Sequence, residues 1–159
     1  MQVVKSLMRG AEMNAVLEIP VEEKTLVTGE ELLAMGDIGP CELIEGEIIK
    51  MSPTGESHGI VEINFATALK QFVQPRKLGR VSGSEVGIFT RRSPDSVRGA
   101  DVVFVSKARL AKRGKSGYLD VAPDLVVEIL SPDDRMSEMI KKLGEYFSIG
   151  VRLVWVADP

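Results

Sequence analysis

The stretch APDLVVEILSP, Ala122 to Pro132, is the clearest structural signal in the chain, because a proline and a polar turn bracket a run of aliphatic residues. Such a run predicts a strand that is buried on both faces. Glu128 interrupts the run, and an ionised carboxylate there is costly unless a cation or hydrogen-bond donors compensate it. Two interpretations follow. Glu128 is either paired with a lysine or arginine inside the fold, or it is a metal ligand at the end of a strand.

Length and composition indicate a soluble globular protein, with 159 residues of which 44% are hydrophobic and 27% charged. We expect residues 26–159 to form a single domain and residues 1–25 a loosely held N-terminal arm. No apolar run reaches the roughly 18 residues of a membrane span, and the first twenty residues lack a signal-peptide core. Cys41 is the only cysteine, which excludes an intrachain disulfide and favours a reducing, cytoplasmic setting.

Charge is unevenly distributed along the chain. The net charge is −3, but the block from Arg76 to Lys115 contains eleven lysines and arginines against three acids. A basic block beside a carboxylate-rich remainder is suited to holding the phosphates of a polyanion near a metal site. Solvated strands and loops are often basic too, and the acidic total argues against a nucleic-acid partner, so both interpretations stay open.

The order of the predicted elements indicates an α/β fold with a mixed sheet. Capping-box spacing from Thr28 to Glu31 predicts a short helix that ends near Met35. The predicted elements after it are a hairpin turning at 45–46, a helix over 57–73, strands over 80–90 and 97–105, the strand quoted above, a helix over 134–148 and a strand over 151–157. A strand, a helix and a further strand in succession predict a parallel pair, so we expect a partly parallel sheet. Sites in such sheets gather at the carboxyl ends of central strands, where Glu128 lies.

Helical spacing also predicts the buried faces of the two long helices. The predicted core residues of the first helix are Val61, Phe65, Ala68, Leu69 and Phe72. Those of the second helix are Met136, Ile140, Leu143 and Phe147.

Asp101 is the first candidate partner for Glu128, because its carboxylate opens the apolar run DVVFV directly after two small residues. Two carboxylates on adjacent strands form an oxygen-rich pocket that suits Mg²⁺. Like charges so close would not both ionise without a cation, which favours a metal. Asp101 could equally cap a turn at the start of its strand.

Lys142 is the second candidate partner. At about 100° per residue it lies close to Tyr146, on the flank of the predicted core face, whereas Lys141 points further away. From there Lys142 can reach the strand ends, orient a metal-bound water and stabilise charge on a phosphate. The alternative is a solvent-facing lysine that pairs with Glu138 four residues earlier.

Several motifs together resemble the Uma-two family of restriction-endonuclease-like proteins in the PD-(D/E)XK nuclease superfamily. They are ELIEGE at 42–47, MSP at 51–53 with His58, DVVFV at 101–105, PDLVVEILSP at 123–132 and GVRLVWVADP at 150–159. The resemblance runs from about Thr28 to Pro159 and implies an αβββαβ nuclease core and Mg²⁺-dependent phosphodiester chemistry. It makes Asp101 the first motif acid and Glu128 the second, with the main-chain carbonyl of Ile129 a further metal ligand.

The chain departs from the superfamily pattern. Leu130 stands where the usual lysine would follow the second acid, and Lys142 falls where this family takes its lysine from the next helix. Ala100 replaces the proline before the first acid. The family pattern also includes His58, as a phosphate or substrate contact or a structural residue, and Glu42, which either approaches the site or holds the hairpin.

The sequence ends at Pro159, where relatives continue into further strands, so we expect a truncated C-terminal part. The edge formed by 151–157 would then be exposed or covered by a second subunit in a homodimer.

Three functions compete. The first is a metal-dependent endonuclease that hydrolyses DNA phosphodiester bonds with Mg²⁺ or Mn²⁺. The second is a catalytically idle nuclease-fold module that binds nucleic acid or protein. The third uses Asp101 and Glu128 as the acid and base of a glycosidase, which predicts activity without a metal.

Overall fold

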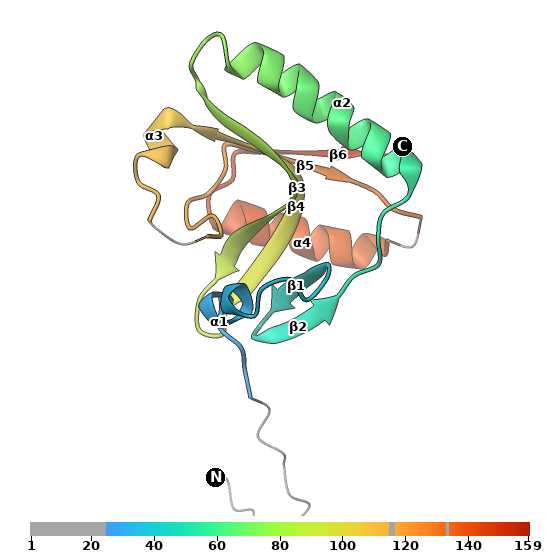
Figure 1. Cartoon of the computed structure of the whole chain (residues 1–159), viewed down its shortest axis with the longest axis vertical. Helices are drawn as coiled ribbons and strands as arrows, with labels where there is room; N and C mark the ends of the chain where they lie inside the picture. The colour runs from blue at the N-terminus through green and yellow to red at the C-terminus, as the bar shows by residue number, and fades with distance from the viewer. Residues whose placement is uncertain (1–24, 115–116, 133) are drawn as a thin grey trace, which may run out of the picture.

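The computed structural model describes residues 25–159 except 115, 116 and 133, so all but the last residue of the expected N-terminal arm lies outside the described residues. The described part contains one mixed sheet with helices on both of its faces (Figure 1). The N-terminal elements are α1 (Gly29–Ala34), β1 (Cys41–Ile44) and β2 (Glu47–Lys50). The elements after them are α2 (Glu56–Val73), β3 (Gly79–Arg91), β4 (Ser96–Ser106), α3 (Lys107–Leu110), β5 (Leu125–Ile129), α4 (Met136–Ser148) and β6 (Leu153–Ala157).

The predicted αβββαβ order is confirmed, and local chemistry explains the N-terminal elements. Thr28 caps α1 with the capping box that its spacing to Glu31 predicts. The hairpin turns through Glu45 and Gly46, which have φ values of 50° and 82°. Two successive left-handed residues are typical of a tight hairpin turn, and glycine takes that conformation without a steric penalty.

Strand β4 is the centre of the sheet. β3 pairs antiparallel with one edge of it along almost its whole length. The other edge is shared, because β1 pairs with β4 at Val97 and β5 pairs with it from Val102 onward. Residues 98–101 of β4 therefore lie between the two partners. β5 and β6 are parallel and flank the helix α4 in sequence, as predicted.

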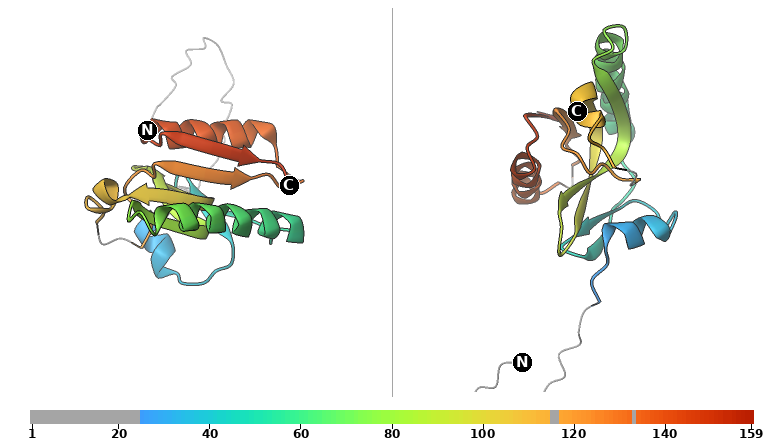
Figure 2. Two further views of the ribbon diagram at one scale, coloured as in Figure 1. Left: turned by 90° about the horizontal axis from the view of Figure 1, so that it is seen from above. Right: turned by 90° about the vertical axis from the view of Figure 1, so that its left-hand side faces the viewer.

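The sheet has a core on each face (Figure 2). On one face, α2 packs Val61 and Phe65 against alternate residues of β4 and β5. On the other face, α4 packs Tyr146 against Val126 and its neighbours. Every residue of β5 is buried, which confirms the prediction of a strand covered on both sides.

The predicted core face of α2 is partly wrong, because Ala68 and Phe72 are exposed and Ala66 packs on the sheet instead. The prediction fails more completely in α4. Ile140 and Phe147 are 62% and 52% exposed, whereas Tyr146 is fully buried. The predicted core residue Met136 is also exposed, and only Leu143 is partly buried.

The physical reason is that α4 turns a polar flank toward the sheet. Lys142 and Glu145 on that flank make ion pairs with charged side chains from β1, β4 and β5. An unpaired buried charge costs more free energy than an exposed apolar side chain. Helix α4 supplies the partners for the buried charges, so its polar flank faces the sheet.

None of the described helices has the length and hydropathy to span a bilayer.

Adjacent residues of α4 test its orientation. Met139 is 7% exposed and its neighbour Ile140 is 62% exposed. We expect Met139→Ala to lower the free energy of unfolding by about 2–5 kcal/mol, because it empties a buried site. Ile140→Ala should change that free energy by less than about 0.5 kcal/mol. Urea denaturation followed by circular dichroism measures both, and the reverse order would contradict the observed packing.

Candidate functional site

A cleft of about 150 Å³ lies where β1 and β5 separate along the edge of β4. Its lining includes all six residues singled out from the sequence: Glu42, His58, Asp101, Glu128, Ile129 and Lys142. They come from β1, α2, β4, β5 and α4, so the fold assembles them from distant parts of the chain. The cleft thus lies at the one place where the pairing along this edge of β4 is interrupted.

Glu128 is held by two residues of α4. Its Oε2 atom accepts a hydrogen bond from Lys142 Nζ at 2.8 Å, and its Oε1 atom accepts one from Tyr146 Oη at 2.7 Å. Burial raises the pKa of Glu128 to about 7, although Lys142 acts to lower it. The structure therefore confirms the pairing of Glu128 with a lysine, whereas its role as a metal ligand stays a prediction.

Lys142 bridges two carboxylates. Its ammonium group lies 2.8 Å from Glu128 Oε2 and 3.2 Å from Glu42 Oε1, and its side chain is only 13% exposed. It is therefore not the solvent-facing partner of Glu138. Burial alone would lower the pKa of Lys142, but the two carboxylates raise it above the usual range, so the group remains a cation at neutral pH.

Arg98 extends this network through the buried side of the cleft. Its guanidinium contacts Glu42 Oε2 at 2.8 Å and both carboxylate oxygens of Glu145 at 2.5–2.7 Å. Burial opposes the charge, but these carboxylates raise the pKa of Arg98. Glu42 also accepts a hydrogen bond from the Gly99 amide, which lies where β4 has no neighbour on this edge. The hairpin, β4 and α4 are thus joined through buried charges.

Asp101 faces the start of α2. Its Oδ2 atom accepts a hydrogen bond from the Ile129 amide at 2.7 Å, so the carboxylate joins β4 to β5 and does not cap a turn of its own strand. Its Oδ1 atom lies 3.4 Å from His58 Nε2. Burial raises the pKa of Asp101, and the Ile129 amide and His58 oppose that shift.

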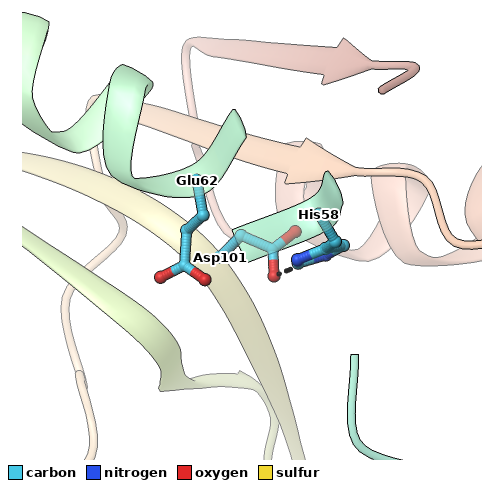
Figure 3. A group of neighbouring side chains, drawn as sticks. All are labelled: His58, Glu62 and Asp101. Carbon is cyan, nitrogen blue, oxygen red and sulfur yellow. Dashed lines mark ion pairs between the residues drawn. The ribbon is translucent and has the colours of Figure 1, made fainter. Parts of the chain in front are cut away.

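Glu62 is a candidate metal ligand that the sequence analysis missed. One potential ligand atom from each of His58, Glu62 and Asp101 lies within 4.8 Å of the other two. Figure 3 shows His58 and Glu62 from α2 and Asp101 from β4 around a common space. His58 and Glu62 are four residues apart, which places them on one face of the helix. This spacing is the sequence feature that could have identified Glu62. The group Glu62, His58 and Asp101 has the chemistry to hold a metal ion.

The basic block is less available than its sequence suggests. Arg91 pairs with Glu45, and Arg92 pairs with Glu30 and Asp95. Arg98 has a side chain that is only 4% exposed, so it is part of the buried network and cannot face a polyanion. The exposed cation that lines the cleft, Arg135, belongs to the start of α4 and lies outside the block.

Apart from the four-residue α3, the αβββαβ order and the mixed sheet agree with the restriction-endonuclease-like class of folds that the sequence predicts. The model of the Uma2 family, described as "Putative restriction endonuclease", matches residues 30–159, and the chain belongs to this family.

A solved structure has the same fold. It is described as "a putative nuclease belonging to DUF820" from Anabaena variabilis ATCC 29413, is 24% identical in sequence and superposes with a TM-score of 0.69. The match covers 84% of this chain and 74% of that chain. A comparison with curated proteins finds no match.

The two adjacent lysines of α4 test the buried network. Lys142→Met leaves Glu128 and Glu42 without their cation, so we expect the free energy of unfolding to fall by about 3–5 kcal/mol. The exposed Lys141→Met should change it by less than about 0.5 kcal/mol. Urea denaturation at neutral pH measures both, and equal small effects would show that Lys142 does not carry the charge balance of the cleft.

Proposed function

We propose that the chain is a metal-dependent endonuclease that hydrolyses DNA phosphodiester bonds. The observation that carries the proposal is that Asp101, Glu128 and Lys142, from three separate elements, line one cleft. Membership of a family described as "Putative restriction endonuclease", and a fold shared with a protein described as "a putative nuclease", support this class of reaction.

The donor chemistry of the cleft fits a divalent cation. Burial raises the pKa of both Asp101 and Glu128, so a nearby positive charge would stabilise their ionised forms. We propose that these two carboxylates and the carbonyl of Ile129 bind Mg²⁺ or Mn²⁺, which prefer oxygen ligands. When bound, the ion would polarise the phosphate and make a water molecule more acidic.

The protein's own residues have distinct roles in this proposal. Tyr146 holds one oxygen of Glu128, and the Ile129 amide holds one oxygen of Asp101, so both carboxylates are fixed before a ligand arrives. Lys142 supplies a permanent positive charge that stabilises the negative charge developing on the phosphate. Glu42 gives this lysine a second contact that does not depend on Glu128.

A catalytically idle module that binds nucleic acid or protein is the second candidate. It is favoured by Glu128, because both of its oxygens already accept hydrogen bonds from α4. In that case Lys142 would replace a metal ion as the partner of the carboxylate. A glycosidase, the third function, would act in the presence of EDTA.

Plasmid cleavage tests these functions together. We expect the protein to nick or linearise plasmid with Mg²⁺ or Mn²⁺ and to be inactive in EDTA. Asp101→Asn keeps an oxygen for the Ile129 amide but removes the charge, so turnover should fall by about 10²-fold or more. Asp158→Asn is the matched control, because Asp158 is exposed and lies outside the lining of the cleft. No cleavage by the folded protein with either metal would favour the idle module.

DNA binding tests the role of Arg135, the exposed arginine that lines the cleft. We propose that Arg135 contacts a phosphate, and Arg135→Ala should then weaken duplex binding and reduce the slope of log K against log salt by about one. Arg152→Ala is the control, because Arg152 has a 75% exposed side chain and pairs with Asp124, away from the lining of the cleft. Fluorescence anisotropy in EDTA measures both, and equal slopes for the two variants would remove Arg135 from the binding surface.

We further propose a homodimer that forms through β6. The outer edge of β6 pairs with no strand in the described part of the chain, and Leu153, Trp155 and Val156 are 40–47% exposed. Such an edge is a template for pairing with a second copy. Two copies would also supply two sites for the two strands of a duplex.

Light scattering tests the dimer. Val156→Lys should shift the protein to monomer, whereas Leu33→Lys on α1, also exposed, should not. A monomeric wild-type protein at all concentrations would contradict the proposal.

A further inference from the structure

The start of α2 places a nitrogen donor and an oxygen donor over Asp101. His58 and Glu62 are four residues apart and therefore lie on one face of the helix. With Asp101 they bring one potential ligand atom each within 4.8 Å of the other two (Figure 3). Glu128 is not a member of this group, because its oxygens are directed to Lys142 and Tyr146.

The imidazole of His58 is buried, and one of its two nitrogens has no partner among the described residues. Its side chain is 7% exposed, and Nδ1 has no hydrogen-bond partner among the described residues. Its Nε2 atom lies 3.4 Å from Asp101 Oδ1, which is longer than an ordinary N–H···O hydrogen bond. A buried polar atom left unpaired costs free energy, so Nδ1 is available to a ligand that the described residues do not supply.

Each carboxylate of the group is oriented from outside and keeps an oxygen for a ligand. Glu62 Oε1 accepts a hydrogen bond from the Ser84 amide at 2.7 Å, and Asp101 Oδ2 accepts one from the Ile129 amide at 2.7 Å. Main-chain donors that fix ligand carboxylates in this way are typical of the outer shell of metal sites. The remaining oxygens and the imidazole form a mixed nitrogen and oxygen donor set.

We propose that His58, Glu62 and Asp101 bind a divalent transition-metal ion, of the class of Zn²⁺ or Co²⁺, in preference to Mg²⁺. Imidazole nitrogen is a good ligand for these metals, whereas Mg²⁺ prefers oxygen donors only. The inference deepens the proposed nuclease function, on which it rests for the role of Asp101. It adds a metal site beside α2 that shares Asp101, and it gives the sole histidine a ligand role. It does not require Glu128.

The sole histidine makes the test specific. Because His58 is the only histidine in the chain, the imidazole signals in a long-range ¹H–¹⁵N spectrum of the untagged full-length protein belong to it. Titration with Zn²⁺ should shift these signals to an end point at one equivalent. Mg²⁺ at tenfold excess should not reproduce this end point, because it prefers oxygen donors and would not bind the imidazole nitrogen. This readout uses the wild-type protein and needs no catalytic activity.

Variants then identify the ligands. His58→Gln and Glu62→Gln should each weaken Zn²⁺ binding, measured by isothermal titration calorimetry, by about tenfold or more, since even outer-shell changes cost that much. Glu56→Gln, exposed in the first turn of the same helix, should leave it unchanged. Zn²⁺ that leaves the His58 signals unmoved, or binds folded His58→Gln as tightly as wild type, would overturn the proposal.

Glu128→Gln distinguishes this site from the nuclease proposal. The variant should lose metal-supported plasmid cleavage but keep the Zn²⁺-induced shift of the His58 signals. A shift without any plasmid cleavage by wild type would support the metal site and contradict the nuclease proposal alone. Loss of the shift in folded Glu128→Gln would contradict an independent site on α2.

Discussion

The ammonium group of Lys142 lies between the carboxylates of Glu128 and Glu42, and the arrangement around the cleft depends on this contact. Each partner belongs to a different element, so the charge fixes α4 against both β5 and the hairpin. Breaking one partner of a buried ion pair is far more costly than losing a surface pair. The guanidinium of Arg98 makes a similar bridge between the carboxylates of Glu42 and Glu145. Two buried cations therefore balance three buried or half-buried acids before any ligand binds.

Much of the fold could be predicted because its strands are recognisable from local sequence. The run around Val126 is aliphatic and bounded by prolines, which is typical of a strand that is buried on both faces. The order of elements then restricts the topology, since a strand, a helix and a strand join most simply as a parallel pair. The capping box at Thr28 fixes the start of the first helix without tertiary information.

The orientation of α4 could not be predicted in the same way. Hydrophobic periodicity assumes that the apolar face is the buried one, and the stripe containing Ile140 and Phe147 is on the exposed face. The helix instead buries the flank whose polar groups meet charges on distant strands. The sequence of α4 alone does not reveal these ion pairs, because Glu42 and Arg98 are far from α4 in the sequence. The same reason hid Glu62, whose significance depends on a strand that follows it by almost forty residues.

The site residues were easier to find where a charge interrupted an apolar pattern. Asp101 and Glu128 stand out because their neighbours are aliphatic, and Lys142 because the helical wheel sets it near Tyr146. What could not be predicted is how they share contacts. The Ile129 residue contacts Asp101 through its amide, and Tyr146 occupies one oxygen of Glu128. The first contact follows from the register of β4 and β5, and the second follows from the placement of α4. Sequence patterns specify neither.

The shared edge of β4 has an evolutionary consequence. β1 and β5 are attached to the same edge but not to each other, so the hairpin is a module that contributes Glu42 without bearing on the β4–β5 pairing. Replacements in the hairpin at positions other than Glu42 leave in place both the buried charge network and the register that presents Asp101 and Glu128. Descendants of such a scaffold can change what surrounds Glu42 at one wall of the cleft and keep the opposite wall unchanged.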